Sequence, residues 1–193
     1  MVKNDSSLQL IENGYKAYQQ LDYEAAAGYY AKALQLEPDN RDANLGAGAT
    51  AILNHEYVLA ENLYRHLLHL NADDEDAFRS ILQLAEFDKA IESDMLDHAN
   101  RHARAPAALF AILGDHYSVQ ERWSDAVNAY TKSVANDQVP DVLFNLAVSL
   151  EHIGAPLEAL PFYRQSLNAD GDSRFDRMAA RRRIAMIQKL TDQ

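Results

Sequence analysis

Apolar residues recur at intervals of three and four along most of this chain, and short polar segments interrupt them. This spacing places apolar side chains on one face of an α-helix. The interruptions combine helix breakers with capping residues, and four of them are Leu-Glu-Pro-Asp-Asn at 36–40, Asn-Ala-Asp-Asp at 71–74, Asp-Gln-Val-Pro-Asp at 137–141 and Asn-Ala-Asp-Gly-Asp at 168–172. The pattern therefore predicts an all-α protein whose helices are joined by tight turns.

The pattern also repeats along the chain at a fixed period. Four positions recur 34 residues apart with the same residue type: Gly14 and Gly48, Tyr23 and Tyr57, Ala26 and Ala60, Tyr30 and Tyr64. A similar arrangement returns twice more, first at Gly114, Trp123, Ala126 and Tyr130 and then at Ala147, Ala159 and Tyr163. A period of this length is the sequence signature of a helical repeat protein.

The period divides the chain into five helical hairpins, at about 7–40, 41–74, 75–106, 107–139 and 140–173. The third repeat is degenerate and about two residues short. Within it, 76–91 reads as a first helix, whereas 93–106 keeps only Leu96 and Ala99 at plausible packing places. We expect the five repeats and a closing helix at 174–191 to form a single domain over residues 1–193.

Each spacing has a packing reason. A small residue midway along the first helix, such as Gly14 or Gly48, is expected to face a small residue early in the second helix, such as Ala26 or Ala60, so that the two backbones approach closely. The tyrosine four places later is expected to fill the space toward the next hairpin. Small and large residues thus have distinct positions in every repeat.

The prolines fit these boundaries with one exception. Pro106, Pro140 and Pro156 stand where a helix is expected to begin, and proline is tolerated in a first turn. Pro161 falls about one turn into the second helix of the fifth repeat, which predicts a bend or a lost hydrogen bond there.

The segment at 174–191 predicts an amphipathic helix. Repeat arrays need a terminal cap that covers the apolar side of the last hairpin, and the two faces expected for it carry Phe175, Ala179, Met186 and Leu190 on one side and Arg174, Arg177 and Arg181 on the other. Ala180, Ile184 and Ile187 widen the apolar arc beyond what a cap requires. A second contact through this helix, such as a homodimer, is therefore the alternative to a simple cap.

The repeated residues resemble the tetratricopeptide-repeat (TPR) family, whose motif places small residues at two fixed positions of a two-helix repeat. The resemblance covers about Ser7 to Ser173. It implies a right-handed α-α superhelix, a TPR solenoid of about five helical hairpins, closed by the capping helix. It also implies a protein or peptide partner held along the concave surface that the first helices line.

Transferring the family's exposed first-helix positions onto this chain gives the candidate peptide-binding residues Ile11, Tyr15, Tyr18, Leu45, Ala49, Ile52, Arg79, Gln83, Asp115 and Asn145. The N-terminal part of this set is apolar and aromatic, and the remainder is polar. One subgroup of the family holds the C-terminal carboxylate of chaperones with Lys and Asn, but Ile11, Tyr15 and Gly46 stand at those places here, which argues against such a clamp. The alternative for each residue is that it packs between neighbouring helices.

The charge of the chain bears on its partners. The net charge of -11 argues against nucleic acid, which requires a concentrated basic surface. From Arg174 onward, however, six Lys and Arg residues stand against two Asp residues, so an acidic body ends in a basic helix. The chain has no cysteine and no apolar run long enough to span a bilayer, so we expect neither disulfides nor membrane insertion. We expect a soluble, cytoplasmic chain by default, or one at the periplasmic face of an inner membrane if an N-terminal anchor has been removed.

Candidate catalytic chemistry is sparse. His66 with His69, and His98 with His102, have the spacing of helical metal ligands, and Asp94 precedes the second pair. Zinc sites use three or four protein ligands, so we interpret both pairs as surface or partly packed histidines and expect no metal. Phosphate loops, dinucleotide glycine motifs and nucleophile elbows are all missing from the sequence. We therefore predict neither an enzyme nor a bound cofactor.

A narrower resemblance concerns the last quarter of the chain. The run from Asn145 to Leu150 and the start of the final helix at Phe175-Asp176-Arg177 are similar to bacterial TPR proteins of type IV pilus systems of the MSHA kind. This resemblance implies an adaptor within a pilus or secretion assembly. The alternative is a soluble cytoplasmic chaperone or regulator that shields a client protein.

Overall fold

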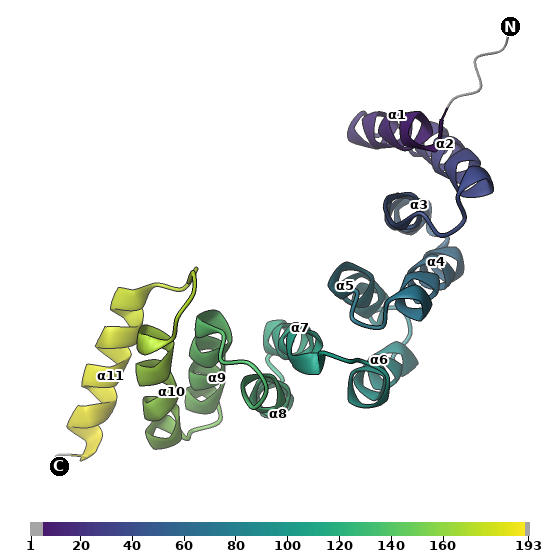
Figure 1. Ribbon diagram of the computed structural model, residues 1–193. Helices are drawn as coiled ribbons and strands as arrows, with labels where there is room; N and C mark the ends of the chain where they lie inside the picture. The colour runs from purple at the N-terminus through teal and green to yellow at the C-terminus, as the bar shows by residue number, and fades with distance from the viewer. Residues whose placement is uncertain (1–5, 192–193) are drawn as a thin grey trace, which may run out of the picture. The chain divides into compact units, whose positions relative to one another are not determined.

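The computed structural model describes residues 6–191, and this range is helical apart from turns and short connections (Figure 1). Its eleven helices are α1 (Ser7–Gln19), α2 (Tyr23–Leu36), α3 (Arg41–Leu53), α4 (Tyr57–Leu70), α5 (Glu75–Leu84), α6 (Ala90–Arg101), α7 (Pro106–Val119), α8 (Trp123–Val134), α9 (Pro140–His152), α10 (Pro156–Asn168) and α11 (Arg177–Thr191). The prediction of an all-α fold made of helical hairpins is confirmed.

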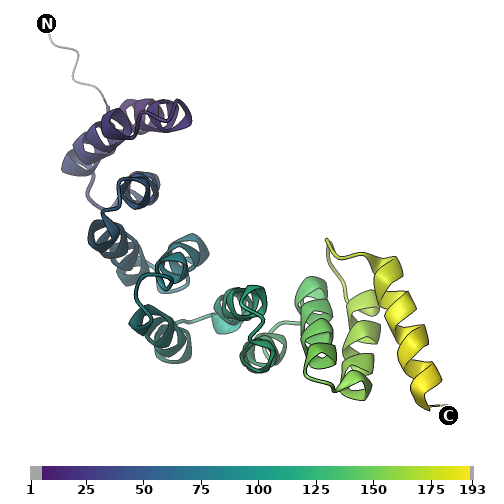
Figure 2. The same ribbon diagram turned by 180° about the vertical axis from the view of Figure 1, so that it is seen from behind.

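The helices group into two compact units, which are described separately. Unit 1 ends at Arg104 and contains α1–α6, and unit 2 begins at Ala105 and contains α7–α11. In unit 1 the first helices α1, α3 and α5 lie on one side and the second helices α2, α4 and α6 on the other (Figure 1). In unit 2 two hairpins, α7–α8 and α9–α10, are followed by α11, which packs against α10 (Figure 2).

Four of the five hairpins turn through one residue in the left-handed backbone region, at Leu21, His55, Glu121 and Gly154. These residues occupy the same place in their repeats, two residues before the second helix begins. Only one of the four is glycine, the residue that takes a positive φ without steric cost. The other three turns therefore hold a strained backbone.

The helix starts follow the capping rules. Ser6, Asp22, Asn40 and Asp74 are N-cap residues whose side chains accept a hydrogen bond from the backbone N–H three residues later. Pro106, Pro140 and Pro156 each stand at the first turn of their helix, as the sequence predicts. Helix α10 continues through Pro161, which has no N–H to donate within the helix.

Three glycines of the first helices lie against tyrosine rings of the second helices. A Cβ atom on Gly14 would lie 2.9 Å from a ring carbon of Tyr30, and Gly48 and Gly114 face Tyr64 and Tyr130 in the same way. The predicted pairing of Gly14 with Ala26 stays a prediction, and the structure adds Tyr30 as a close neighbour of Gly14. The aromatic ring, which is larger than an alanine side chain, is what excludes a side chain at the glycine.

The degenerate third repeat departs from the predicted helix bounds. Helix α5 ends at Leu84, and backbone hydrogen bonds from Phe87 and Asp88 to the Leu84 carbonyl form a turn. Asp88 then accepts a hydrogen bond from the backbone N–H of Ala90, where α6 begins. The predicted first helix at 76–91 is thus divided by a turn, because Asp88 starts a new helix.

The last helix differs from its prediction in both its start and its buried face. It begins at Arg177 because Asp141 binds the backbone N–H groups of Arg174 and Phe175 and holds that segment away from the helix. Phe175 stacks on Phe144 with ring centroids 4.6 Å apart. Ala180 and Ile187 form the buried stripe, whereas Met186 is 58% and Leu190 63% exposed.

Over residues 6–191, each helix is too short or too polar to cross a bilayer.

Candidate functional site

Eight of the ten candidate peptide-binding residues lie on the first helices of unit 1. They divide among α1, α3 and α5 as Ile11, Tyr15 and Tyr18, then Leu45, Ala49 and Ile52, then Arg79 and Gln83. Because these helices share one side of unit 1, the eight residues belong to one helical layer (Figure 1). We call this layer the first-helix surface of unit 1.

The candidates on this surface differ in how far other side chains cover them. Tyr15 is 56% exposed, and Arg79 and Gln83 are also exposed. The remaining five are half-buried, and Ile11 packs against the core residues Leu10 and Ala17. Ile11 therefore contributes to packing, whereas Tyr15 presents most of an aromatic ring to solvent.

A cluster of tyrosines surrounds the exposed ring. Tyr18 lies one turn after Tyr15 and tilts against Tyr23, with ring centroids 5.7 Å apart. Burial raises the pKa of Tyr30, and the neighbouring Tyr18 and Tyr15 raise it further. The sequence prediction of an aromatic N-terminal surface places Tyr15 and Tyr18 in α1, and the structure adds Tyr30 beneath them.

The other two candidates, Asp115 in α7 and Asn145 in α9, come together in unit 2. The Tyr130 hydroxyl donates a hydrogen bond to Asp115 Oδ1 at 2.7 Å, and the Asn145 amide approaches the same oxygen at 3.4 Å. Burial and the adjacent Asp115 carboxylate both raise the pKa of Tyr130. Both of these donors to Asp115 are neutral groups. Neither carries a positive charge that would balance the carboxylate.

The next hairpin repeats this arrangement with one difference. The Tyr163 hydroxyl donates to Glu151 Oε1 at 2.6 Å, and Arg183 of α11 forms an ion pair with the same carboxylate at 3.3 Å. Glu151 is therefore paired with a cation, whereas among residues 6–191 the donors to Asp115 are neutral. Sequence reasoning missed the hydroxyl contacts because the separations differ, 15 residues from Asp115 to Tyr130 and 12 from Glu151 to Tyr163.

A buried ion pair joins two first helices of unit 1. Arg41 at the start of α3 donates two hydrogen bonds to Asp74, at 2.7 and 2.9 Å, and a third to Asp76 at 2.6 Å. Burial opposes ionisation of Asp74, but hydrogen bonds from Arg41 and from the Ala77 N–H hold its pKa below the ordinary value. This contact was not anticipated from sequence, since it joins adjacent repeats across 33 residues.

The histidine pairs serve other contacts. His98 Nε2 hydrogen-bonds to the Ala72 carbonyl at 2.7 Å, and Asp94 forms an ion pair with Arg65 at 3.1 Å. His66 bonds to Asp39 at 2.9 Å, away from His69. Among residues 6–191, groups of three or more side chains suited to holding a metal ion are absent.

Comparisons with known proteins show a family similarity for one part of the chain and a similarity of fold for most of it. Residues 113–174 match a family model described as tetratricopeptide repeat. A crystal structure of the MamA protein is 18% identical with a TM-score of 0.54, covering 84% of this chain and 90% of its own. The Pseudomonas aeruginosa pilF structure is 17% identical with a TM-score of 0.57, covering 96% of this chain and 84% of its own.

These identities are low enough that the two solved structures speak for the fold alone. The family match falls on α7–α10 and lies within unit 2, and the first two hairpins of unit 1 have glycine–tyrosine contacts like that of Gly114 and Tyr130. Both lines agree with the 34-residue period in the sequence. Residues 113–174 are therefore similar to the tetratricopeptide-repeat family, and the helical-hairpin fold extends this similarity to the rest of the described chain.

Proposed function

We propose that this protein is a non-catalytic interaction scaffold that binds a peptide or a helix of a partner protein along the first helices of its repeats. The observation that carries the proposal is the exposure of Tyr15, a large aromatic ring on the first-helix surface of unit 1. Aromatic side chains are enriched at protein interfaces because they bury a large area at a low cost in conformational entropy.

In unit 1 the proposed contact is an apolar anchor followed by polar positioning. Tyr15 and Tyr18 would receive an apolar side chain of the partner, together with Leu45, Ala49 and Ile52 on the next first helix. Arg79 and Gln83 are exposed two hairpins along and would hydrogen-bond to the partner's backbone. The half-buried Ile11 would support the anchor from below.

In unit 2 the proposed contact is electrostatic. Asp115 is half-buried and accepts hydrogen bonds only from neutral donors among its observed contacts. A lysine, an arginine or an amino terminus of the partner would therefore pair with it, in a setting where water screens the charge less than at an open surface. Asn145 would hold the carboxylate in position for that pair.

We propose an adaptor role in a bacterial pilus or secretion assembly as the biological setting. The similarity of the C-terminal residues to pilus-associated TPR proteins supports it, as does the structural similarity to pilF. A chaperone or regulator that shields a client segment is the alternative that the same surface would serve. Genes for pilus components beside the coding sequence would favour the adaptor.

We also propose that α11 mediates a homodimer. Met178, Met186 and Leu190 remain exposed on this helix although it already packs against α10. Light scattering on the purified protein would give a dimer mass, and Met186→Glu with Leu190→Glu should return a monomer. A monomer for the unmodified chain would contradict this proposal.

The scaffold function is testable without a known partner. Peptides selected from a random display library on the whole chain would be titrated by calorimetry against the chain and its variants. Tyr15→Ala and Asp115→Asn should each weaken binding by about tenfold or more, the loss typical of a central interface residue. Asn62→Ala and Asn128→Ala, exposed on the second helices α4 and α8, are the matched controls.

Each variant must keep the circular dichroism spectrum and midpoint of the unmodified chain, so that lost binding is not lost folding. Unchanged affinity in both Tyr15→Ala and Asp115→Asn would overturn the first-helix assignment. Equal losses in the control variants would move the binding surface to the second helices.

A further inference from the structure

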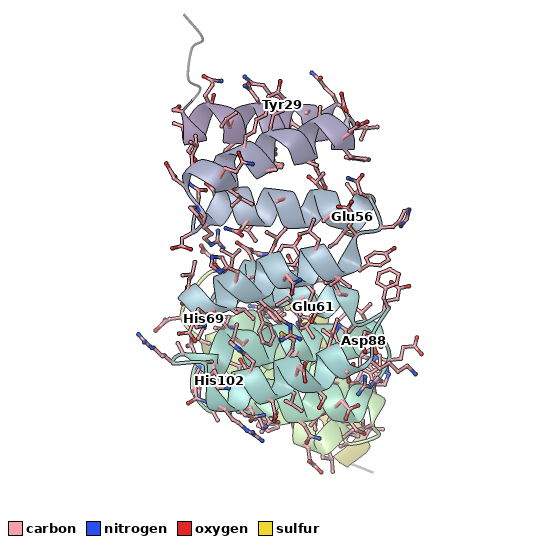
Figure 3. The ribbon with its side chains drawn as sticks, turned by 90° about the vertical axis from the view of Figure 1, so that its right-hand side faces the viewer. Tyr29, Glu56, Glu61, His69, Asp88 and His102 are labelled. Atoms are coloured by element: carbon pink, nitrogen blue, oxygen red, sulfur yellow. The ribbon has the colours of Figure 1, made fainter. Side chains whose placement is uncertain are left out.

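A pocket of about 480 Å³ opens in unit 1, away from the first-helix surface. It lies between the end of α4, the α4–α5 connection and α6, and its polar side chains include Arg65, His69, Asp73, His98, His102 and Arg104. Figure 3 shows His69 and His102 at one edge of the unit, opposite Glu56 and Asp88. The pocket is thus at the edge where α4 and α6 end.

The charge of the pocket is opposite to that of its surroundings. Residues 1–104 contain nine Lys and Arg against eighteen Asp and Glu, a net charge of -9. Five of the ten residues that line the pocket are nevertheless Arg or His, and only Asp73 is acidic. Three of the five histidines of residues 1–104 gather here.

Some of the polar side chains that line the pocket already form ion pairs or hydrogen bonds within the chain, and the others can donate to a ligand. Arg65 pairs with Glu61 at 2.7 Å and with Asp94 at 3.1 Å. In contrast, the side chains of His69 and Arg104 make no hydrogen bond or ion pair with any other residue between 6 and 191, and the observed side-chain contact of His102 is with the His98 ring. His69, His102 and Arg104 therefore offer donors to a ligand.

The wall that carries these donors is fixed by hydrogen bonds. His98 Nε2 donates to the Ala72 carbonyl at 2.7 Å, since a carbonyl oxygen can only accept. The Arg104 backbone N–H donates to Asp73 Oδ1 at 2.9 Å, so this carboxylate oxygen is held by the chain. The α4–α5 connection and the end of α6 are thus held together before any ligand binds.

We propose that this pocket binds a compact oxyanion of the phosphate or sulfate class. The guanidinium of Arg104 would donate to two of its oxygens, and the rings of His69 and His102 would each donate to another. A phosphate group accepts several charge-assisted hydrogen bonds at once, and the pocket supplies donors from three separate positions. The bound group is either free inorganic phosphate or the phosphate of a phosphorylated side chain.

The test uses the whole chain and three probes. Inorganic phosphate, sulfate and phosphoserine would each be titrated at pH 6.0 and constant ionic strength, with calorimetry for affinity and histidine ring NMR signals for location. Sulfate should bind and should shift the signals of His69 and His102. Tighter binding of phosphoserine than of phosphate would assign the ligand to a phosphorylated protein, and equal binding would assign it to the free anion.

Paired variants make the result specific to this pocket. His69→Gln with Arg104→Gln should weaken sulfate binding by about fivefold or more, because the pair loses three charge-assisted hydrogen bonds. His55→Gln with Lys89→Gln, which also removes one histidine and one basic side chain but away from the pocket, should leave sulfate binding unchanged. Equal binding by both pairs, or an undetectable response of the unmodified chain, would overturn the proposal.

Discussion

The ring of Tyr30 occupies the space that a side chain on Gly46 would need. A Cβ atom on Gly46 would overlap the end of the ring, including its hydroxyl oxygen, while Gly14 approaches the same ring from α1. Tyr30 in α2 is therefore enclosed by glycines of two successive first helices. This contact joins the first and second hairpins of unit 1.

Substitution of Gly46 tests how rigid this contact is. Gly46→Ala should destabilise the chain by about 1–3 kcal/mol, because a packed tyrosine must shift to admit one methyl group. Gly28→Ala is the matched control, since its Cβ would meet nothing within 4 Å. That control should be neutral or stabilising by up to about 1 kcal/mol, as alanine favours a helix over glycine. Urea denaturation followed by circular dichroism would measure both.

The enclosed tyrosines show which parts of the fold can be predicted from sequence. The 34-residue period placed Gly14 and Tyr30 in successive helices, because period and helix geometry depend on spacing alone. It did not reveal that the two residues touch, since that contact depends on how closely the helices approach. Contacts between side chains depend on how the helices pack, which the sequence period does not specify.

The candidate site could also be predicted only in part from the sequence. Each candidate residue lies on the first helix expected for it, since family positions follow the repeat. The hydrogen bond from Tyr130 to Asp115 could not be predicted, because its counterpart in the next repeat uses another separation. The pocket beside His102 could not be predicted from sequence. It depends on the degenerate third repeat, where the repeat pattern is weakest.

The hairpin turns give a prediction with its own reciprocal control. Glu121 has a φ of 58° and Gly154 a φ of 81° at equivalent places in unit 2. Glu121→Gly should stabilise the chain by about 0.5–1 kcal/mol by removing strain, and Gly154→Ala should destabilise it by about 1–2 kcal/mol. Thermal denaturation would show midpoint shifts of opposite sign. A lowered midpoint for Glu121→Gly would mean that its side chain, rather than its backbone, matters.

The Arg41–Asp74 pair predicts a dependence of stability on acid pH. The Asp74 side chain is 3% exposed and that of Arg41 is 47% exposed, so solvent weakens the pair. Arg41→Met should cost about 1–2 kcal/mol at neutral pH, mainly because a buried carboxylate loses its partner. Arg101→Met, which removes an exposed pair with Asp97, should change stability by less than about 0.5 kcal/mol.

The sign of the pH effect follows from the direction of the pKa shift. The pKa of Asp74 is lowered in the folded chain, so its ionised form is favoured by folding. The contribution is complete above the ordinary pKa of aspartate near 4 and disappears as the pH falls through the lower folded value. Arg41→Met should therefore show a smaller loss of stability than the unmodified chain between about pH 5 and pH 2. Parallel acid titrations of the two proteins would contradict the assignment.

The predicted single domain over residues 1–193 can be tested with the only tryptophan of the chain. Trp123 stacks on His152 in unit 2, with ring centroids 3.8 Å apart and an interplanar angle of 6°. Its fluorescence follows unit 2, whereas circular dichroism follows every helix. Repeats that fold as one cooperative domain should give the same unfolding midpoint with both probes.

Gly46→Ala makes this comparison decisive, because Gly46 lies in unit 1 and Trp123 in unit 2. In a single cooperative domain, destabilising unit 1 lowers the tryptophan midpoint by the same amount as the circular dichroism midpoint, since neither unit unfolds alone. If unit 2 folds independently, the tryptophan midpoint stays where it is in the unmodified chain. That result would replace one domain with two, and would mean that a partner bound to unit 1 does not stabilise unit 2.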